Sequence, residues 1–325
     1  MPFSTGHRPD HPEVVKRRVA LHNLATYAAM MAAVASLPLA SANRVNLLAD
    51  KGGPGILDQH DTGSCEGHGH AESGTLRLAN LGLSKGLISP TALYVGALLM
   101  DRTLNPDGTL STVTDTGTMP ASIQAAWQTF GARLAVDDPQ YPAQSTTLYQ
   151  TPSNQNSPLI LPSPEILHAD SPYRYQGSYF VQSNGCQRIL DVLTTLAAGR
   201  TLTNAIPASG SQFQGYRGGV LGALSGDIDH CNHVVDYAWN GSAPDFAAFL
   251  SALTTGNLST ATALAMAQGS AGVPNLVFIC QNSWGDTAWG EADSMSRAPG
   301  GLYRADLNYL NQCEDPCVID ITAAA

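Results

Sequence analysis

The spacing of apolar positions predicts helices in the first half of the chain and strands in the second. Residues 64–81, 90–100 and 122–130 have the pattern of helices, and Ser64 is a suitable N-cap for the first of them. A further short helix is predicted over residues 186–198. The later apolar runs are short and typical of strands, and they cover residues 233–239, 276–281 and 301–307.

This segregation of helices from strands favours an α+β fold over a doubly wound α/β sheet. Two segments interrupt the pattern. Residues 137–172 are rich in Pro, Ser, Thr and Asn and are typical of a long linker-like excursion. The Ala-rich residues 245–267 predict a helical insertion.

The charge of the chain narrows the classes of function. Only 13% of the 325 residues are charged, against roughly 25% in an average protein. The formal net charge is -10, which disfavours nucleic-acid binding because phosphate contacts need clustered Lys and Arg. No stretch of uninterrupted apolar residues is long enough for a membrane-spanning helix.

The N-terminal segment supports two interpretations. Lys16, Arg17 and Arg18 precede the apolar residues 19–40, and the small residues 40–42 fit a cleavage site, which is the layout of a secretory signal. The same apolar stretch also has the spacing of an amphipathic helix, and we favour a retained helix that packs on the body. A signal over residues 1–42 implies a secreted or periplasmic protein, whereas a retained helix implies the cytoplasm or an assembly.

The six cysteines do not form paired CxxC motifs, so a zinc ribbon is poorly supported. Cys313 and Cys317 frame Glu-Asp-Pro, a turn-forming spacer. They close a small disulfide loop in one interpretation and are free thiols in the other.

Three separated segments supply a nucleophile, a base and an orienting amide. Cys65 follows Gly63 and Ser64 at the start of a predicted helix, where the unsatisfied N–H groups and the helix dipole favour the thiolate. Gln59 lies six residues earlier and can return its side-chain N–H to the same place.

The predicted base is a histidine at the start of an apolar strand. We prefer His233 to His230 because His233 joins the apolar Val234 and Val235 directly. Asn282, at the end of another strand, can accept from one imidazole N–H and leave the other ring nitrogen facing Cys65.

In these blocks the chain resembles the papain-like cysteine peptidases. The most specific part is Asn282-Ser283-Trp284-Gly285 followed by Trp289-Gly290-Glu291, which resembles the NSWG and WGE signature with one extra residue between its halves. Asp58-Gln59 and Gly63-Ser64-Cys65 resemble the DQ and GSC block, and residues 213–220 resemble the strand before the catalytic histidine.

The resemblance implies a papain-like two-domain fold. A helical left domain over residues 51–170 follows the N-terminal segment 1–50, and a right domain with a barrel-like sheet covers residues 171–325. The cleft between them binds an extended peptide or protein substrate. The strands that carry Cys231 and Cys280 are neighbours in such a fold, so these two cysteines are either a cross-strand disulfide or two buried thiols.

The roles implied are those of a thiol peptidase without a cofactor. Cys65 attacks as a thiolate paired with His233, Asn282 orients the histidine, and Gln59 with the Cys65 N–H stabilises the oxyanion. Substrate binding or shielding is implied for Trp284, Gly63, Ser64 and Glu66. We predict no metal site, because His68, His70, Glu66 and Glu72 lack a third ligand segment.

Several positions depart from the family pattern. Glu66 replaces the usual aromatic residue after the nucleophile, and Thr62 replaces a half-cystine. The usual glycine in the strand after His233 is not evident, since Asp236 and Tyr237 occupy that region. The extra residue lies within 286–288.

The sequence thus predicts a papain-like cysteine peptidase, with residues 1–50 as a self-inhibiting segment of a zymogen. Two other functions stay open. One is an inactive papain-like scaffold that serves as a binding or assembly subunit, and the other is an amidase or transpeptidase on the same fold.

Overall fold

The structure is a computed structural model of the chain. It describes residues 8, 32, 34–39, 57–59, 62–83, 86–112, 114–131, 134, 173–181, 183–255, 259–269, 273–284, 289–290 and 301–323. The predictions for the basic run 16–18, the segment 137–172 and the insertion at 286–288 lie outside these residues, as does most of the helix expected over residues 19–40.

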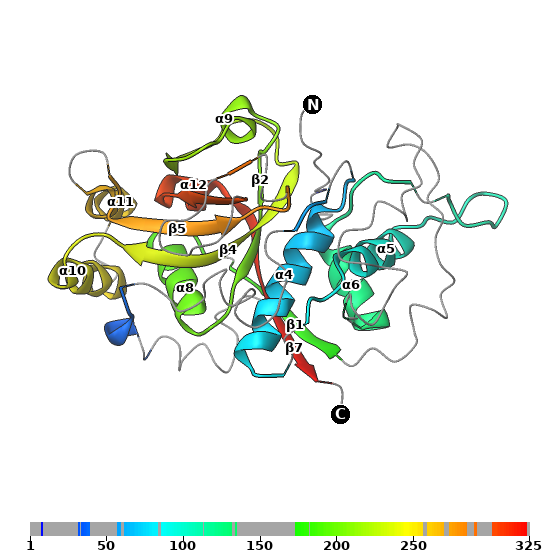
Figure 1. The fold of residues 1–325 in the computed structure, drawn as a ribbon, viewed down its shortest axis with the longest axis horizontal. Helices are drawn as coiled ribbons and strands as arrows, with labels where there is room; N and C mark the ends of the chain where they lie inside the picture. The colour runs from blue at the N-terminus through cyan, green and yellow to red at the C-terminus, as the bar shows by residue number, and fades with distance from the viewer. Residues whose placement is uncertain are drawn as a thin grey trace.

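Three helices form one side of the molecule, and Figure 1 shows them to the right of the sheet. They are α4 (Cys65–Asn80), α5 (Pro90–Met100) and α6 (Pro120–Phe130). Helices α5 and α6 each begin with a proline, whose missing N–H costs nothing in the first turn. Figure 1 places α4 between the sheet and the other two helices.

The other side is built on a sheet of seven strands in the order β1-β7-β2-β4-β5-β6-β3. Neighbouring strands are antiparallel except for β3 and β6. The strands are β1 (Tyr173–Phe180), β2 (Leu202–Ile206), β3 (Val220–Leu221), β4 (His230–Trp239), β5 (Leu276–Gln281), β6 (Leu302–Ala305) and β7 (Glu314–Ala323).

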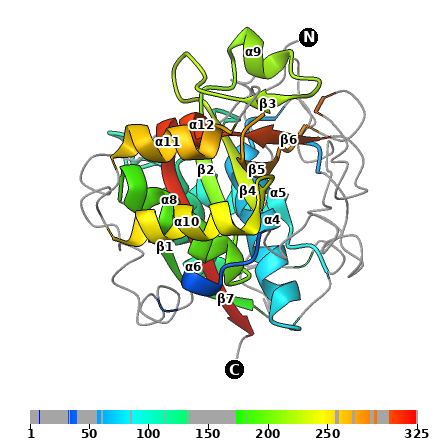
Figure 2. The same cartoon turned by 90° about the vertical axis from the view of Figure 1, so that its left-hand side faces the viewer.

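Helices cover this sheet, and Figure 2 shows α8, α10 and α11 in front of the strands. The apolar side chains of α8 and α10 share one buried cluster with those of β4 and β5. The remaining elements are η2 (Val34–Ser36), α8 (Gly185–Ala197), α9 (Ser211–Gln214), α10 (Ala243–Thr254), α11 (Thr260–Gln268) and α12 (Leu307–Gln312).

Strand β7 connects the two sides because its side chains alternate between two buried clusters. Val318 packs in the cluster that lies under α8 and α10. Cys317, Ile319 and Ile321 pack in the cluster of α4, α5 and α6. The period of two along a strand therefore lets one strand contribute to both hydrophobic cores.

The predicted α+β class is confirmed, and α5 has the predicted bounds. The insertion is two helices, α10 and α11, instead of one. Ser64 stands at the N-cap of α4, but its side chain makes no capping hydrogen bond.

The structure also decides whether the cysteines form disulfides or are free thiols. All six cysteines are free thiols, so no small disulfide loop joins Cys313 to Cys317. The Glu-Asp-Pro spacer starts strand β7 instead of forming a turn. Cys280 lies opposite Val234 in the β4–β5 register, which excludes a cross-strand pair with Cys231.

Among the residues that the structure describes, no helix has the length and apolar character needed to cross a membrane.

Candidate active site

Cys65 is the first residue of α4 and is fully buried. The turn before it is fastened to the loop that precedes α6, because Asp115 Oδ1 accepts from the Gly63 N–H at 2.9 Å and from the Tyr94 hydroxyl at 2.6 Å. Tyr94 Oη also accepts from the Gly117 N–H at 3.2 Å. These contacts hold the turn of the predicted nucleophile in place without a disulfide.

Gln59 lies beside the same turn. Its Nε2 donates to the Thr62 carbonyl at 2.7 Å, and its Oε1 accepts from the Ser283 hydroxyl at 2.5 Å. The Gln59 backbone N–H donates to the Ser283 carbonyl at 2.7 Å, and Asp58 forms a bridge with Trp284. The structure therefore brings the Gln59 segment, the Cys65 turn and the segment after β5 together.

The histidine that meets Asn282 is His230. The ring Nε2 of His230 and Asn282 Oδ1 are 2.6 Å apart, so Nε2–H donates to the amide oxygen. Asn282 Oδ1 also accepts from the Ser283 N–H at 2.9 Å. The Trp284 ring lies 4.9 Å from the His230 ring, centroid to centroid, and covers this hydrogen bond.

The sequence-based choice of His233 as the partner of Asn282 is wrong. His233 is fully buried, its Nε2 lies 3.1 Å from Thr201 Oγ1, and its Nδ1 lies 3.3 Å from the Glu72 carboxylate. His230 and His233 are three positions apart on β4, so their side chains leave opposite faces of the strand. His233 faces the second turn of α4 instead of Asn282.

The signal that identifies His230 is the antiparallel pairing of β4 with β5. In the β4–β5 register His233 pairs with Gln281, so Asn282, which directly follows β5, comes opposite Asn232. His230 begins β4 two residues before Asn232 and leaves the same face of the strand, which makes it the diagonal neighbour of Asn282. The preference for an apolar neighbour pointed instead to a residue inside β4, where side chains are buried on both faces.

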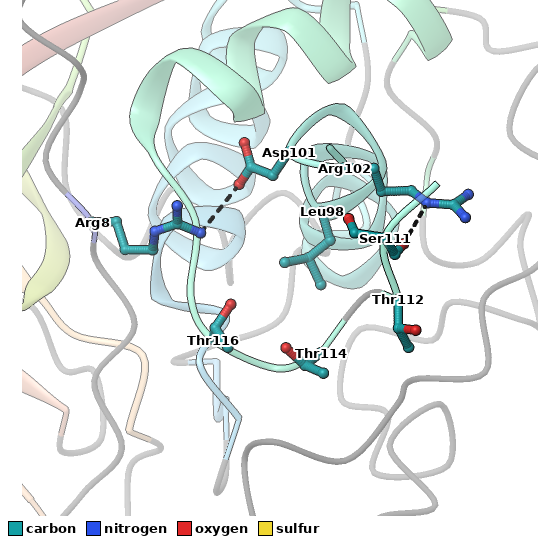
Figure 3. Close-up of a pocket in the computed structure, with 8 residues that line it drawn as sticks. All are labelled: Arg8, Leu98, Asp101, Arg102, Ser111, Thr112, Thr114 and Thr116. Carbon is teal, nitrogen blue, oxygen red and sulfur yellow. Dashed lines mark hydrogen bonds and ion pairs between the residues drawn. The ribbon is translucent and has the colours of Figure 1, made fainter. Parts of the chain in front are cut away.

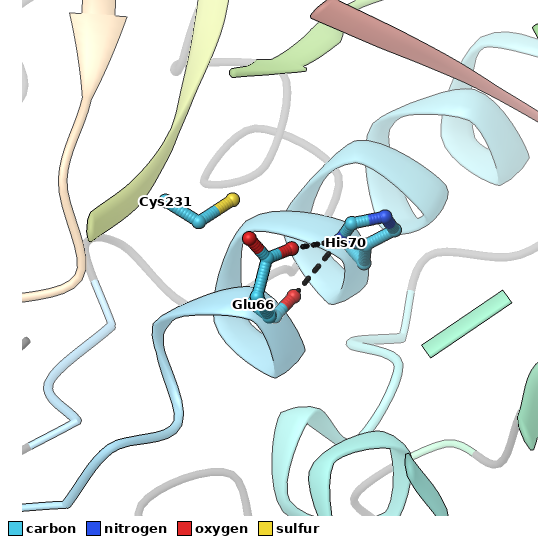
Figure 4. A group of neighbouring side chains, drawn as sticks. All are labelled: Glu66, His70 and Cys231. Carbon is cyan, nitrogen blue, oxygen red and sulfur yellow. Dashed lines mark hydrogen bonds and ion pairs between the residues drawn. The ribbon is translucent and has the colours of Figure 1, made fainter. Parts of the chain in front are cut away.

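The start of β4 lies against the first turns of α4. Cys231 Sγ, the Glu66 carboxylate and the His70 ring all lie within 4.8 Å of one another (Figure 4). Cys65 directly precedes Glu66, and His230 directly precedes Cys231. The contact between α4 and β4 therefore brings together the two chain segments that carry Cys65 and His230.

Glu66 lies in the interface between α4 and β4, and the role in substrate binding expected from its position after the nucleophile stays a prediction. Its side chain is 1% exposed and points between α4 and β4 (Figure 4). The carboxylate lies 3.3 Å from His70 Nδ1, one helical turn further along α4. Burial of this carboxylate is offset by the imidazole beside it.

Burial suppresses the reactivity of three other thiols. Desolvation raises the pKa of Cys231 well above its usual value, and the nearby Glu66 carboxylate raises it further. Desolvation likewise raises the pKa of Cys280, and it raises the pKa of Cys313 to about 12. These three thiols stay protonated at neutral pH, and protonated thiols are poor nucleophiles.

No protein-family model and no curated protein matches the chain. Solved structures do match. Xylellain, a cysteine protease from Xylella fastidiosa, has a TM-score of 0.61 and 15% identity over 98% of this chain and 96% of its own. ProCathepsin B S9 from Trypanosoma congolense has a TM-score of 0.57 and 14% identity over 99% of this chain and 87% of its own.

A recombinant stem bromelain precursor has a TM-score of 0.52 and 14% identity over 100% of this chain and 78% of its own. At these identities the likeness concerns the fold. It extends over nearly the whole chain in all three structures. The chain therefore has the fold of the papain-like cysteine proteases.

Proposed function

We propose that this protein is a cysteine peptidase in which Cys65 is the nucleophile, His230 the acid and base, and Asn282 the residue that orients His230. The observation that carries the proposal is the 2.6 Å contact of His230 Nε2 with Asn282 Oδ1, beside the start of the Cys65 helix. Because Nε2 is held by the amide, Nδ1 is the ring nitrogen left for proton transfer.

The reaction follows from these groups. The Cys65 thiolate attacks the carbonyl carbon of an extended peptide, and the C–S bond forms as the carbonyl electrons move to oxygen. The Cys65 N–H and a side-chain N–H of Gln59 stabilise this oxyanion. The His230 imidazolium gives its proton to the leaving nitrogen as the C–N bond breaks. Water then attacks the thioester, loses a proton to His230, and releases the acid and the thiolate.

The N-terminal segment is proposed to inhibit this site. Cys65 and His230 are both fully buried in this structure, so a substrate reaches them only after a rearrangement. Arg8 lies in the pocket of Figure 3, where its N–H donates to the Thr118 carbonyl at 3.0 Å and its guanidinium lies 3.7 Å from Asp101. This contact is on the helical side of the molecule.

A second part of the same segment is fixed on the sheet side. Val34 is buried among the apolar residues under α8 and α10. The Trp239 N–H donates to the Leu39 carbonyl at 2.7 Å, and the Tyr237 hydroxyl donates to the Pro38 carbonyl at 2.7 Å. The segment is thus attached to both sides of the fold, which supports a zymogen-like arrangement.

The test is the rate of iodoacetamide labelling at about pH 6, where an ordinary thiol with a pKa near 8.5 is almost fully protonated. In a variant without residues 2–30 we expect Cys65 to be labelled selectively, with peptide cleavage, and His230→Ala to slow labelling on the order of 100-fold. His233→Gln is the matched control and keeps the labelling.

Mass spectrometry of the adduct locates the label, and circular dichroism checks that each variant is folded. Equal loss in the His230 and His233 variants contradicts the assignment of His230. A folded variant that neither labels at Cys65 nor cleaves peptides supports the binding or assembly scaffold. Labelling with transfer of the acyl group to an amine supports a transpeptidase.

A further inference from the structure

The structure places three chemically different metal ligands around one buried point between α4 and β4. The Glu66 carboxylate, the His70 imidazole and Cys231 Sγ have ligand atoms that all lie within 4.8 Å of one another. Their side chains are 1%, 0% and 2% exposed, respectively. From the sequence alone a metal was not expected, because His68, His70, Glu66 and Glu72 lacked a ligand from another segment, and the fold supplies that ligand from β4.

We propose that Glu66, His70 and Cys231 bind a zinc ion, which fastens the nucleophile helix to the strand of His230. A carboxylate oxygen, an imidazole nitrogen and a thiolate are the ligands that Zn²⁺ takes in proteins, and a fourth position is completed by water in three-ligand sites. The proposal does not depend on peptidase activity.

Charge balance favours this ion in a buried place. One carboxylate and one thiolate neutralise the two charges of Zn²⁺, and the imidazole binds as a neutral ligand. A buried ion whose charge is fully compensated avoids the large cost of an unpaired charge in the interior. A monovalent or trivalent cation would leave one net charge in the same buried place.

The local backbone leaves room for the sulfur. Gly69 faces Cys231 across the interface, and a Cβ atom at this glycine would lie 3.0 Å from Cys231 Sγ. The absence of a side chain at Gly69 therefore lets the sulfur approach α4 next to Glu66 and His70, as Figure 4 shows for the three ligands.

The neighbouring acidic and histidine side chains have other partners. His68 Nδ1 lies 2.9 Å from the Ser64 carbonyl and 3.2 Å from Ser64 Oγ. The Glu72 carboxylate lies 3.3 Å from His233 Nδ1. Among the residues that the structure describes, the ligand set is therefore the three that converge.

Zinc binding changes the protonation of His70 and Cys231, and the resulting dependence of the affinity on pH can be measured. His70 Nδ1 lies 2.9 Å from the Glu66 carbonyl and 3.3 Å from the Glu66 carboxylate, and Nδ1–H donates to the carbonyl in the metal-free protein. Zinc binding through Nδ1 leaves the imidazole neutral with its proton on Nε2, and it releases the thiol proton of Cys231 to solvent. The affinity therefore falls as the pH is lowered.

The position of the ligands gives the ion a structural role. Glu66 directly follows Cys65, and Cys231 directly follows His230. An ion bound by Glu66 and Cys231 fixes the distance between the two segments that carry the proposed catalytic pair, without occupying the catalytic thiol. We therefore expect zinc to raise the melting temperature of the protein.

The experiment uses the full chain with Cys65→Ala, which removes the catalytic thiol as a competing zinc ligand and makes the result independent of activity. After dialysis against Zn²⁺, mass spectrometry of the metal content is expected to give one zinc per chain. With Co²⁺ in place of zinc, a charge-transfer absorption from the Cys231 thiolate to the metal is expected. Adding Cys231→Ala should weaken zinc binding by at least about 100-fold.

Cys280→Ala is the matched control because Cys280 is a buried thiol in β5, away from the ligands, and this variant should bind zinc as before. The proposal is overturned if the Cys65→Ala protein binds no zinc, or if its Co²⁺ form has no absorption from a thiolate. If Cys231→Ala does not fold, the Co²⁺ spectrum of the Cys65→Ala protein is the test: a thiolate-to-metal absorption supports the site, and its absence overturns the proposal.

Discussion

At the scale of single residues, Asp115 is the side chain on which the nucleophile turn depends. Its Oδ1 accepts from both Gly63 N–H and the Tyr94 hydroxyl, and it is 4% exposed. Gly63 itself has no space for a side chain, since a Cβ atom there would lie 2.9 Å from the Gly117 nitrogen. The Asp115 carboxylate therefore holds this turn. Thr62 stands where the family pattern has a half-cystine, so no disulfide is available there.

Removing the acceptor should loosen this turn. Asp115→Ala leaves the buried Gly63 N–H and the Tyr94 hydroxyl without this partner, which costs about 1–3 kcal/mol for each unsatisfied group. We expect a lower free energy of unfolding in urea and a slower labelling of Cys65. Asp115→Asn keeps an oxygen acceptor and is the control. If both variants lose the same stability and the same rate of Cys65 labelling, the oxygen acceptor is not what holds the turn.

The same residue gives the stability a dependence on pH. Desolvation raises the pKa of Asp115 above its ordinary value, despite the opposing hydrogen bonds from Tyr94 and Gly63. The folded protein therefore holds this proton more tightly than the unfolded chain does, and the stability falls as the pH rises from 3.8 through the raised pKa. Asp115→Asn should remove this slope.

The measurement compares urea midpoints of the two proteins at a series of pH values. Asp115→Asn is expected to gain stability relative to the natural chain as the pH rises toward neutrality, because it buries no charge. A difference that stays constant across the series contradicts a raised pKa at Asp115.

At the scale of elements, α4 is central because it packs against the sheet on one side and against α5 and α6 on the other. Gly74 marks a close approach to β7 and to α6. A Cβ atom at Gly74 would lie 2.7 Å from Ile321 Cδ1, 2.9 Å from Ile88 Cδ1, and closer still to the Trp127 ring. The absence of a side chain sets how near the helix comes to β7 and α6.

Gly74→Ala should therefore destabilise the protein although alanine is the better helix former. The helix propensity gains about 1 kcal/mol, whereas overpacking a buried contact costs about 1–3 kcal/mol. We expect a lower urea midpoint. Trp127→Phe removes the nearest ring atoms, so adding it to Gly74→Ala should restore part of the loss relative to Trp127→Phe alone. A more stable Gly74→Ala protein would contradict this packing.

Elements with a strong local pattern could be predicted from the sequence, and the others could not. Pro90 and Met100 bound a helix whose start is marked by Ser89, which accepts from the Ala92 N–H at 3.1 Å. By contrast, β7 starts at Glu314, in a segment whose local sequence is typical of a turn. Its conformation is set by pairing with β1 and β2, which are far away in the chain.

In the candidate site, too, some residues could be predicted from a local motif and others only from the tertiary packing. The turn before Cys65 and the block after β5 are local motifs, and from them the sequence predicts Cys65 and Asn282 as members of the site. The partner of Asn282 depends on which face of β4 each histidine occupies, and that follows from the register, in which His233 pairs with Gln281 and His230 lies on the face of Asn282. Cys231 as a neighbour of Glu66 also follows from packing, which no local pattern records.

At the scale of the whole molecule, the N-terminal segment is attached to both sides of the fold. Deleting residues 2–30 removes the Arg8 contacts and keeps Val34 and the residues up to Leu39, which hold the sheet core. We expect the deletion to raise kcat/KM toward a peptide substrate and to speed the labelling of Cys65.

Arg8→Ala is expected to have a smaller effect, because the Arg8 side chain is 44% exposed and an exposed ion pair contributes about 0–1 kcal/mol. Arg102→Ala, which alters another arginine of the same pocket, is the control and should leave the activity unchanged. Unchanged or lower activity after the deletion would mean that the segment does not block the site.

Strand β7 has a consequence for how the protein is made. Ile319 and Ile321 complete the helical core, and Val318 completes the core under the sheet helices. The other helices and strands that the structure describes all precede β7 in the chain. While the ribosome is still adding residues before Ala323, neither core is complete, so the nascent chain exposes apolar surface from both sides at once. Both sides then gain their last buried strand in the same step, so we expect the candidate site to assemble only after synthesis has passed β7.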